Sequence, residues 1–210
     1  MGGIAASFAM PFRSLSRASW LVGSLLVLLF PVGLVILLGH SVNVTRSARA
    51  GGDRMPGLRL TRRGALEGAA VTGLGLLLTA PFAVALVPLQ AHLLPALARG
   101  GLGAGGLQQP VAVVIAAGLL SLPWALTMLA LVPTGVAALA RSGQIADLFA
   151  VTSSLRTVRT RFPVWNVVTA AIVSAWLLGL AAVAACGVGA LPGVLYAILV
   201  SAHASAALEP

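Results

Sequence analysis

Long apolar runs alternate with short arginine-bearing segments along this chain of 210 residues. Because an α-helix rises about 1.5 Å per residue, about 20 consecutive apolar residues cross the hydrocarbon core of a membrane. The pattern predicts an all-α, polytopic transmembrane helical bundle with about five spans plus interfacial amphipathic helices, in a single integral membrane domain over residues 1–210. The expected spans lie near 20–39, 67–90, 110–140, 164–187 and 190–208.

The segment before the first span has an amphipathic pattern. On a helical wheel the apolar side chains Ile4, Phe8, Phe12 and Leu15 share one face, and Arg13 and Arg17 lie opposite. We therefore expect residues 4–17 to form an interfacial helix. Pro31 and Gly33 should bend the span that follows.

Arginines concentrate in two of the segments between spans. Residues 40–66 carry six arginines against Asp53, for a charge of +5, and residues 141–163 carry four against Asp147, for +3. The positive-inside rule makes both loops cytoplasmic. Five crossings then place the C-terminus inside and the N-terminus outside. Arg13 and Arg17 oppose that topology; the alternative is a re-entrant first run with both flanks inside.

Composition narrows the class of protein further. The chain is 59% hydrophobic and 8% charged, with a mean hydropathy of +1.04, whereas soluble domains carry about 25% charged residues. The net charge of +9 resides in short loops, so we expect no nucleic-acid partner. A single cysteine, Cys186, excludes an internal disulfide.

Candidate catalytic and cofactor-binding residues are sparse. The four acids, Asp53, Glu67, Asp147 and Glu209, all map to loops or interfaces, and no histidine cluster has metal-ligand spacing. Residues 101–106 formally match a dinucleotide-binding fingerprint, but no strand precedes them and no acid follows at the required distance. We therefore expect no cofactor, no metal and no enzymatic activity.

Two structural features stand out beside the apolar runs. Glu67 follows Arg63 by four residues at the start of a span, which predicts an ion-paired clamp at the interface. Small residues recur every four positions near the C-terminus, a spacing that allows close helix packing in lipid. They are Ala181, Ala185, Gly189, Gly193, Ala197 and Ser201.

The two basic loops offer a contact surface. Residues 143–160 show a helical apolar face, which predicts a helix lying on the inner membrane surface. We expect anionic lipid headgroups or a partner to contact the arginines of both loops. These are Arg59, Arg62, Arg63, Arg156, Arg159 and Arg161.

Several short motifs together resemble one family. They are Pro11-Phe12 and Trp20; Gly39-His40, Arg46 and Gly51-Gly52-Asp53; Met55-Pro56 and Gly64 to Gly68; Pro133, Ala140-Arg141, Gly143 and Ala146-Asp147-Leu148-Phe149; and Tyr196 with His203. The chain resembles the DUF4013 membrane proteins of bacteria and archaea from about residue 8 to 205. It departs from them after Pro56, where Gly57-Leu58-Arg59 replaces the usual acid or aromatic residue. The resemblance implies a polytopic bundle and carries no known activity.

These features favour a non-enzymatic accessory, scaffold or transport-related subunit of the bacterial inner membrane. The alternative is a permease for a hydrophobic or amphipathic solute that works with a cytoplasmic ATPase. Expected partners are the lipid bilayer, another membrane subunit or that ATPase, and a second copy of the chain.

Overall fold

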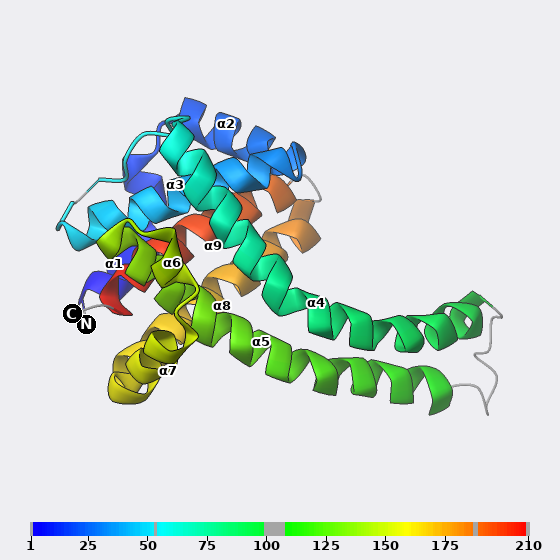
Figure 1. Cartoon of the computed structure of the whole chain (residues 1–210). Coiled ribbons are helices and arrows are strands. Elements are labelled where there is room, and N and C mark those ends of the chain that lie inside the picture. The colour runs from blue at the N-terminus through cyan, green and yellow to red at the C-terminus, as the bar shows by residue number, and fades with distance from the viewer. Residues whose placement is uncertain (1, 53, 99–107, 187–188, 209–210) are drawn as a thin grey trace. The chain divides into compact units, whose positions relative to one another are not determined.

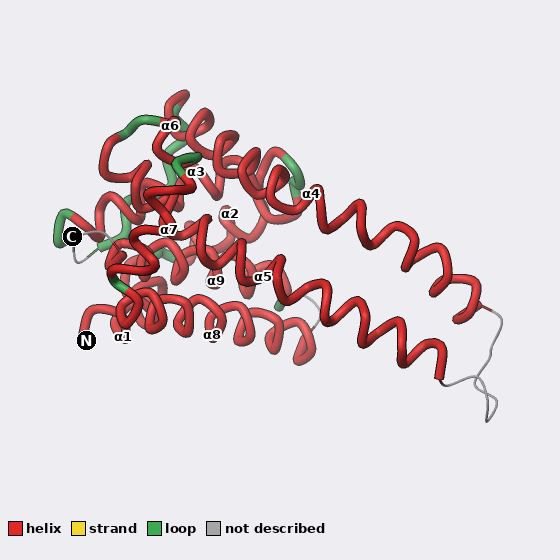
Figure 2. Tube along the Cα trace, turned by 60° about the horizontal axis from the view of Figure 1, so that its bottom comes forward, coloured by secondary structure: helices red, strands yellow, loops and turns green. Residues whose placement is uncertain are grey.

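The computed structural model describes residues 2–52, 54–98, 108–186 and 189–208, and all the regular structure in these ranges is helical (Figures 1 and 2). The fold is an all-α bundle. Its helices are α1 (Gly2–Ser14), α2 (Arg17–Leu28), α3 (Val32–Arg49), α4 (Arg62–Ala98), α5 (Gln108–Ser142), α6 (Ile145–Leu148), α7 (Val151–Thr160), α8 (Phe162–Cys186) and α9 (Ala190–Ser205), followed by the 3₁₀ turn η1 (Ala206–Leu208). The chain divides into two compact units, Met1–Leu74 with Ala130–Pro210, and Gly75–Leu129.

Four helical stretches among the described residues are long and apolar enough to cross a membrane. They are Arg62–Val87, Ser121–Ser142, Phe162–Ala182 and Ala190–Leu208. Many of their large apolar side chains are exposed, as Leu76, Leu77 and Val84 are on α4. Because a water-soluble surface would not carry such a belt, these helices indicate an integral membrane protein. They overlap the last four expected spans.

The first apolar run forms two helices where one bent span was expected over 20–39. Helix α2 ends at Leu28 and is too short to be one of the long apolar stretches. Helix α3 begins at Val32 and has 18 residues, but its second half is polar and it is not among those stretches either. Pro31 lacks the N–H that would continue the helical hydrogen bonds. The two helices pack against each other, and a Cβ on Gly33 would collide with the Leu26 carbonyl oxygen. Residues 17–49 therefore form a helical hairpin.

Helix α9 is the centre of the larger unit and contacts α1, α2, α3 and α8. Its buried side chains Leu195, Leu199 and Ala202 join Leu37 and Val44 of α3 in the hydrophobic core. Figure 1 shows α9 lying among the earlier helices of this unit. The last helix of the chain thus packs against the first three.

Helix α1 differs from the interfacial helix expected over 4–17. Its buried residues include Ser7, Met10 and Pro11, whereas Phe12 is exposed. The helix packs against α9, and Ser7 Oγ lies 2.6 Å from His203 Nδ1. Phe12, on the apolar face of the wheel, stays exposed, and the side that carries Ser7 and Met10 is buried.

The smaller unit contains the second part of α4 and the first part of α5. Trp124 Nε1 donates a hydrogen bond to Thr79 Oγ1 at 3.2 Å, which joins the two helices. Helix α4 is continuous through Pro81, Pro88 and Pro95.

Candidate functional site

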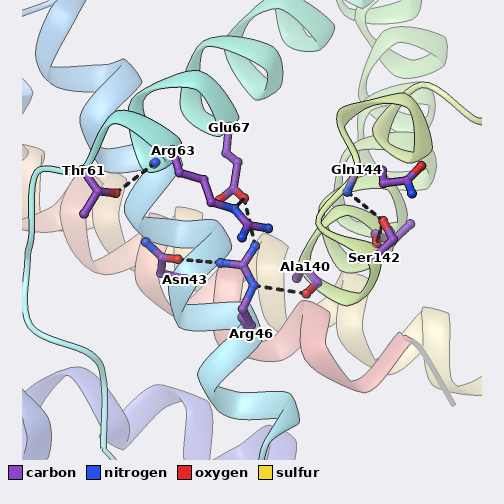
Figure 3. A network of polar contacts seen from close by, with 10 residues as sticks. Asn43, Arg46, Thr61, Arg63, Glu67, Ala140, Ser142 and Gln144 are labelled. Carbon is purple, nitrogen blue, oxygen red and sulfur yellow. Dashed lines mark hydrogen bonds and ion pairs between the residues drawn. The ribbon is translucent and has the colours of Figure 1, made fainter.

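A buried carboxylate and two arginines form a polar cluster in the larger unit (Figure 3). Glu67 is 2% exposed. Its Oε1 accepts hydrogen bonds from Arg63 Nε at 2.8 Å and from Arg46 Nη2 at 3.0 Å. The Arg63–Glu67 pair has the four-residue spacing noted in the sequence, and Arg46 of α3 is a second cation that the sequence analysis did not assign to Glu67.

Local sequence places Glu67 in the first turns of α4. Thr61 lies just before the helix, and its Oγ1 accepts the Gly64 N–H at 3.0 Å, as a helix-capping hydroxyl does. Glu67 itself lies beyond the first turn, where the influence of the helix dipole is weak. The Thr61 cap therefore favours starting α4 at Arg62.

Glycines allow α3 and α4 to cross at backbone contact. A Cβ on Gly39 would collide with the Gly64 carbonyl oxygen, and one on Gly68 would collide with that of Val35. These glycines belong to the motifs Gly39-His40 and Gly64 to Gly68. The crossing brings Arg46 within reach of Glu67.

Arg46 connects three helices. Its Nη1 donates to Asn43 Oδ1 at 2.7 Å and its Nε donates to the Ala140 carbonyl at 3.3 Å (Figure 3). Ala140 lies in the last turn of α5, where unpaired carbonyls favour a cation. Gly143, with φ +71°, follows the end of that helix. The guanidinium of Arg46 therefore joins α3, α4 and the end of α5.

The cluster carries an excess of positive charge. The side chains of Arg46 and Arg63 are 34% and 65% exposed, against 3% for Glu67. Glu67 Oε2 is buried, and no hydrogen-bond partner is found for it among the described residues. Glu67 holds both guanidinium groups through Arg63 Nε and Arg46 Nη2, and the rest of the Arg63 side chain faces solvent.

The other predicted contact arginines fall into two groups. Arg59, Arg62, Arg156 and Arg159 are exposed. Arg161 is only half-buried, and its Nη1 donates to the Leu208 carbonyl at 3.0 Å, which ties the α7–α8 junction to η1. The exposed four are therefore the residues available to an anionic partner.

Helix α7 is amphipathic, as the expected surface helix over 143–160 would be, although α6 and a short break precede it. Val151 and Leu155, one turn apart, are 45% and 53% exposed, and Ser154 beside them is buried. Arg156 and Arg159 lie on the adjoining face. An apolar stripe next to arginines is the arrangement of a helix at a membrane surface.

Only some of the small residues predicted at four-residue spacing lie at a helix contact. At the α8–α9 crossing a Cβ on Gly193 would lie 2.5 Å from the Gly179 carbonyl oxygen, and Ala197 is fully buried. A Cβ on Gly189 would collide with the Ala182 carbonyl oxygen. Ala181 is exposed, Ser201 is half-buried, and the side chain of Ala185 lies outside the described residues.

Other polar contacts escaped the sequence analysis because they join distant helices. Thr45 Oγ1 donates to the Ala202 carbonyl at 2.8 Å, and Tyr196 donates its hydroxyl to the Phe8 carbonyl at 3.3 Å. His40 of α3 is 5% exposed, and burial lowers its pKa. Buried hydroxyls on two facing apolar helices are the signal that could have suggested such contacts.

Within the described ranges, no three His, Cys, Asp or Glu side chains form a group that could hold a metal ion. Asp53, Glu209, the glycine-rich residues 101–106 and the side chain of Ala185 lie outside the described residues.

Comparison with known proteins identifies the family of the chain. A family model described as "Protein of unknown function (DUF4013)" matches residues 22–202. No curated protein and no solved structure matches the chain. The matched region includes the α3–α4 glycine crossing, the Glu67 cluster, α7 and α9 as far as Ala202. Because the model covers most of the sequence, the chain belongs to the DUF4013 family.

Proposed function

We propose that the chain is a non-enzymatic accessory or scaffold subunit of the bacterial inner membrane that holds a basic surface against anionic headgroups. The observation that carries the proposal is α7, whose exposed apolar residues Val151 and Leu155 adjoin the exposed Arg156 and Arg159. Each arginine near an anionic leaflet contributes about 1 kcal/mol of attraction. Arg59 and Arg62 are the exposed arginines that the first basic loop adds.

The helix count supports one topology for this surface. Four crossings, with residues 17–49 as a hairpin that returns to its own side, place both termini in the cytoplasm. The arginines of residues 40–66 and of residues 141–163 then share that side, as the positive-inside rule requires.

Spin labelling tests where α7 lies. A nitroxide is attached to Leu155→Cys or, as the matched control, to Ser153→Cys on the opposite exposed side, each in a Cys186→Ser background. In proteoliposomes with anionic lipid we expect the 155 label to be accessible to oxygen and the 153 label to a water-soluble relaxation agent. Equal accessibility of the two labels to the water-soluble agent would contradict the proposal. So would an unchanged oxygen accessibility of the 155 label after Arg156 and Arg159 are replaced by Gln.

Purification tests the scaffold role. The protein is tagged, purified in mild detergent from its native host, and its co-purifying chains are quantified by mass spectrometry. A second membrane subunit in fixed stoichiometry supports the proposal. A stoichiometric ATPase whose hydrolysis rate depends on α7 would favour the alternative, a permease for a hydrophobic or amphipathic solute. Helix α7 lies between two long apolar helices in the chain, so it could transmit motion between the ATPase and the spans.

A further inference from the structure

An apolar groove of about 650 Å³ lies along α8 and α9 beside the α1–α2 junction. Its volume falls within the range of about 300–1,000 Å³ that is typical of small-ligand sites. The lining residues are Phe12, Trp20, Leu178, Gly179, Ala182, Gly189, Pro192, Gly193 and Tyr196.

Small residues form the floor of the groove and aromatic rings form its wall. Gly179 and Gly193, at the α8–α9 crossing, present backbone in place of side chains. The Phe12 ring lies 5.6 Å from that of Trp20 and 5.5 Å from that of Tyr196. Because the Tyr196 hydroxyl already donates to the Phe8 carbonyl, the wall offers an apolar ligand mainly ring surface.

The residues around the groove indicate that membrane lipid contacts it. Two of the long apolar stretches, Phe162–Ala182 and Ala190–Leu208, supply its floor. Leu177, Leu178 and Leu180 beside it are exposed by more than half. In a bilayer this face contacts hydrocarbon, so the available occupant is an acyl chain.

Two arginines lie close in sequence to the aromatic residues of the groove. Arg13 follows Phe12 directly, and Arg17 begins α2 three residues before Trp20. Both are exposed, and the described carboxylates, Glu67 and Asp147, form no ion pair with either. Arginine fits a phosphate with two parallel hydrogen bonds, so the pair complements an anionic headgroup.

We propose that the groove binds one acyl chain of an anionic phospholipid whose phosphate lies at Arg13 and Arg17. This site shares no residue with the α7 surface, so either can fail while the other stands. It differs from general surface attraction in requiring both a charge and a groove of fixed shape.

Tryptophan quenching tests the site. Trp20 lines the groove, whereas Trp176 lies on α8, 40% exposed and outside it. Two single-tryptophan proteins are prepared by replacing the remaining tryptophans with Phe, one keeping Trp20 and the other Trp176. Each is reconstituted in phosphatidylcholine with increasing fractions of phosphatidylglycerol brominated on its acyl chains.

We expect Trp20 to be quenched well beyond the mole fraction of brominated lipid, and Trp176 in proportion to it. Replacing Arg13 and Arg17 by Gln should lower the preference at Trp20 by about fivefold per arginine, whereas Arg156→Gln with Arg159→Gln should leave it unchanged. Proportional quenching of Trp20 in the wild-type background, or a preference that survives loss of both Arg13 and Arg17, would overturn the proposal.

A second pair of variants separates the groove from the charges. Ala182 lines the groove, and its neighbour Ala181 is exposed and does not. Ala182→Leu should abolish the preference at Trp20, and Ala181→Leu should retain it, with both proteins monodisperse in gel filtration. Equal preference in the two folded variants would show that no acyl chain occupies the groove and would overturn the proposal.

Discussion

The unequal exposure of the two arginines around Glu67 gives a quantitative prediction for their replacement by glutamine. Arg63 is 65% exposed, and ion pairs open to solvent contribute about 0–1 kcal/mol. Arg46 is more buried and also bonds Asn43 and the Ala140 carbonyl. Hydrogen bonds to charged groups contribute about 1.5–3 kcal/mol. We therefore expect Arg46→Gln to lower the free energy of unfolding by about 2 kcal/mol and Arg63→Gln by less than about 1 kcal/mol.

Equilibrium unfolding in mixed micelles with increasing SDS measures these differences, and a double-mutant cycle isolates the pair itself. Arg46→Gln, Glu67→Gln and the double variant should yield a coupling energy of about 1 kcal/mol or more, because the two groups share one hydrogen bond. The cycle removes the contribution of the Asn43 and Ala140 contacts, which are lost in both arms. A cost for Arg63→Gln equal to that of Arg46→Gln, or a coupling below about 0.5 kcal/mol, would refute this reasoning.

Three further predictions concern α3 and α4. Gly68→Ala should lower the free energy of unfolding by about 1–3 kcal/mol, because the new Cβ would collide with backbone. Gly73→Ala on the same helix places its Cβ in open space and should be neutral or slightly stabilising. A similar loss of stability in both variants would contradict the glycine crossing. Burial lowers the folded-state pKa of His40, so the unfolded state binds the proton first. The free energy of unfolding, measured in SDS, should therefore fall as pH drops below about 6.5. His40→Gln should flatten this dependence on pH, and an unchanged slope would show that His40 is not its cause. Thr45→Val removes a hydrogen bond to α9 and should lower the free energy of unfolding by about 0.6 kcal/mol, and by at most about 1.7 kcal/mol. Thr72→Val should lower it by less, because that hydroxyl bonds only its own helix. Equal losses in the two variants would contradict a stabilising interhelical bond.

The features that follow from local sequence were predictable. The apolar runs after residue 62 contain the long helices of the structure, since length and hydropathy suffice to identify them. The Arg63–Glu67 spacing places both groups on one helix face, and Arg63 Nε lies 2.8 Å from Glu67 Oε1.

The features that depend on helix packing were not predictable in the same way. Arg46 is 21 residues from Glu67 across a loop, so its contact depends on how α3 crosses α4. Residues 20–39 have the hydropathy of one span, but Pro31 interrupts the helix and Gly33 lets the two halves pack together. The buried face of α1 depends on α9, whose sequence lies at the other end of the chain.

The central place of α9 has a consequence for biosynthesis. About 140 residues separate the end of α3 at Arg49 from the start of α9 at Ala190. At about 5–20 residues per second, a ribosome makes α9 about 7–30 s after α3. During that delay α1, α2 and α3 lack their main packing partner, α9. A nascent chain that is stalled or truncated before residue 190 therefore exposes these amino-terminal helices to quality-control proteases.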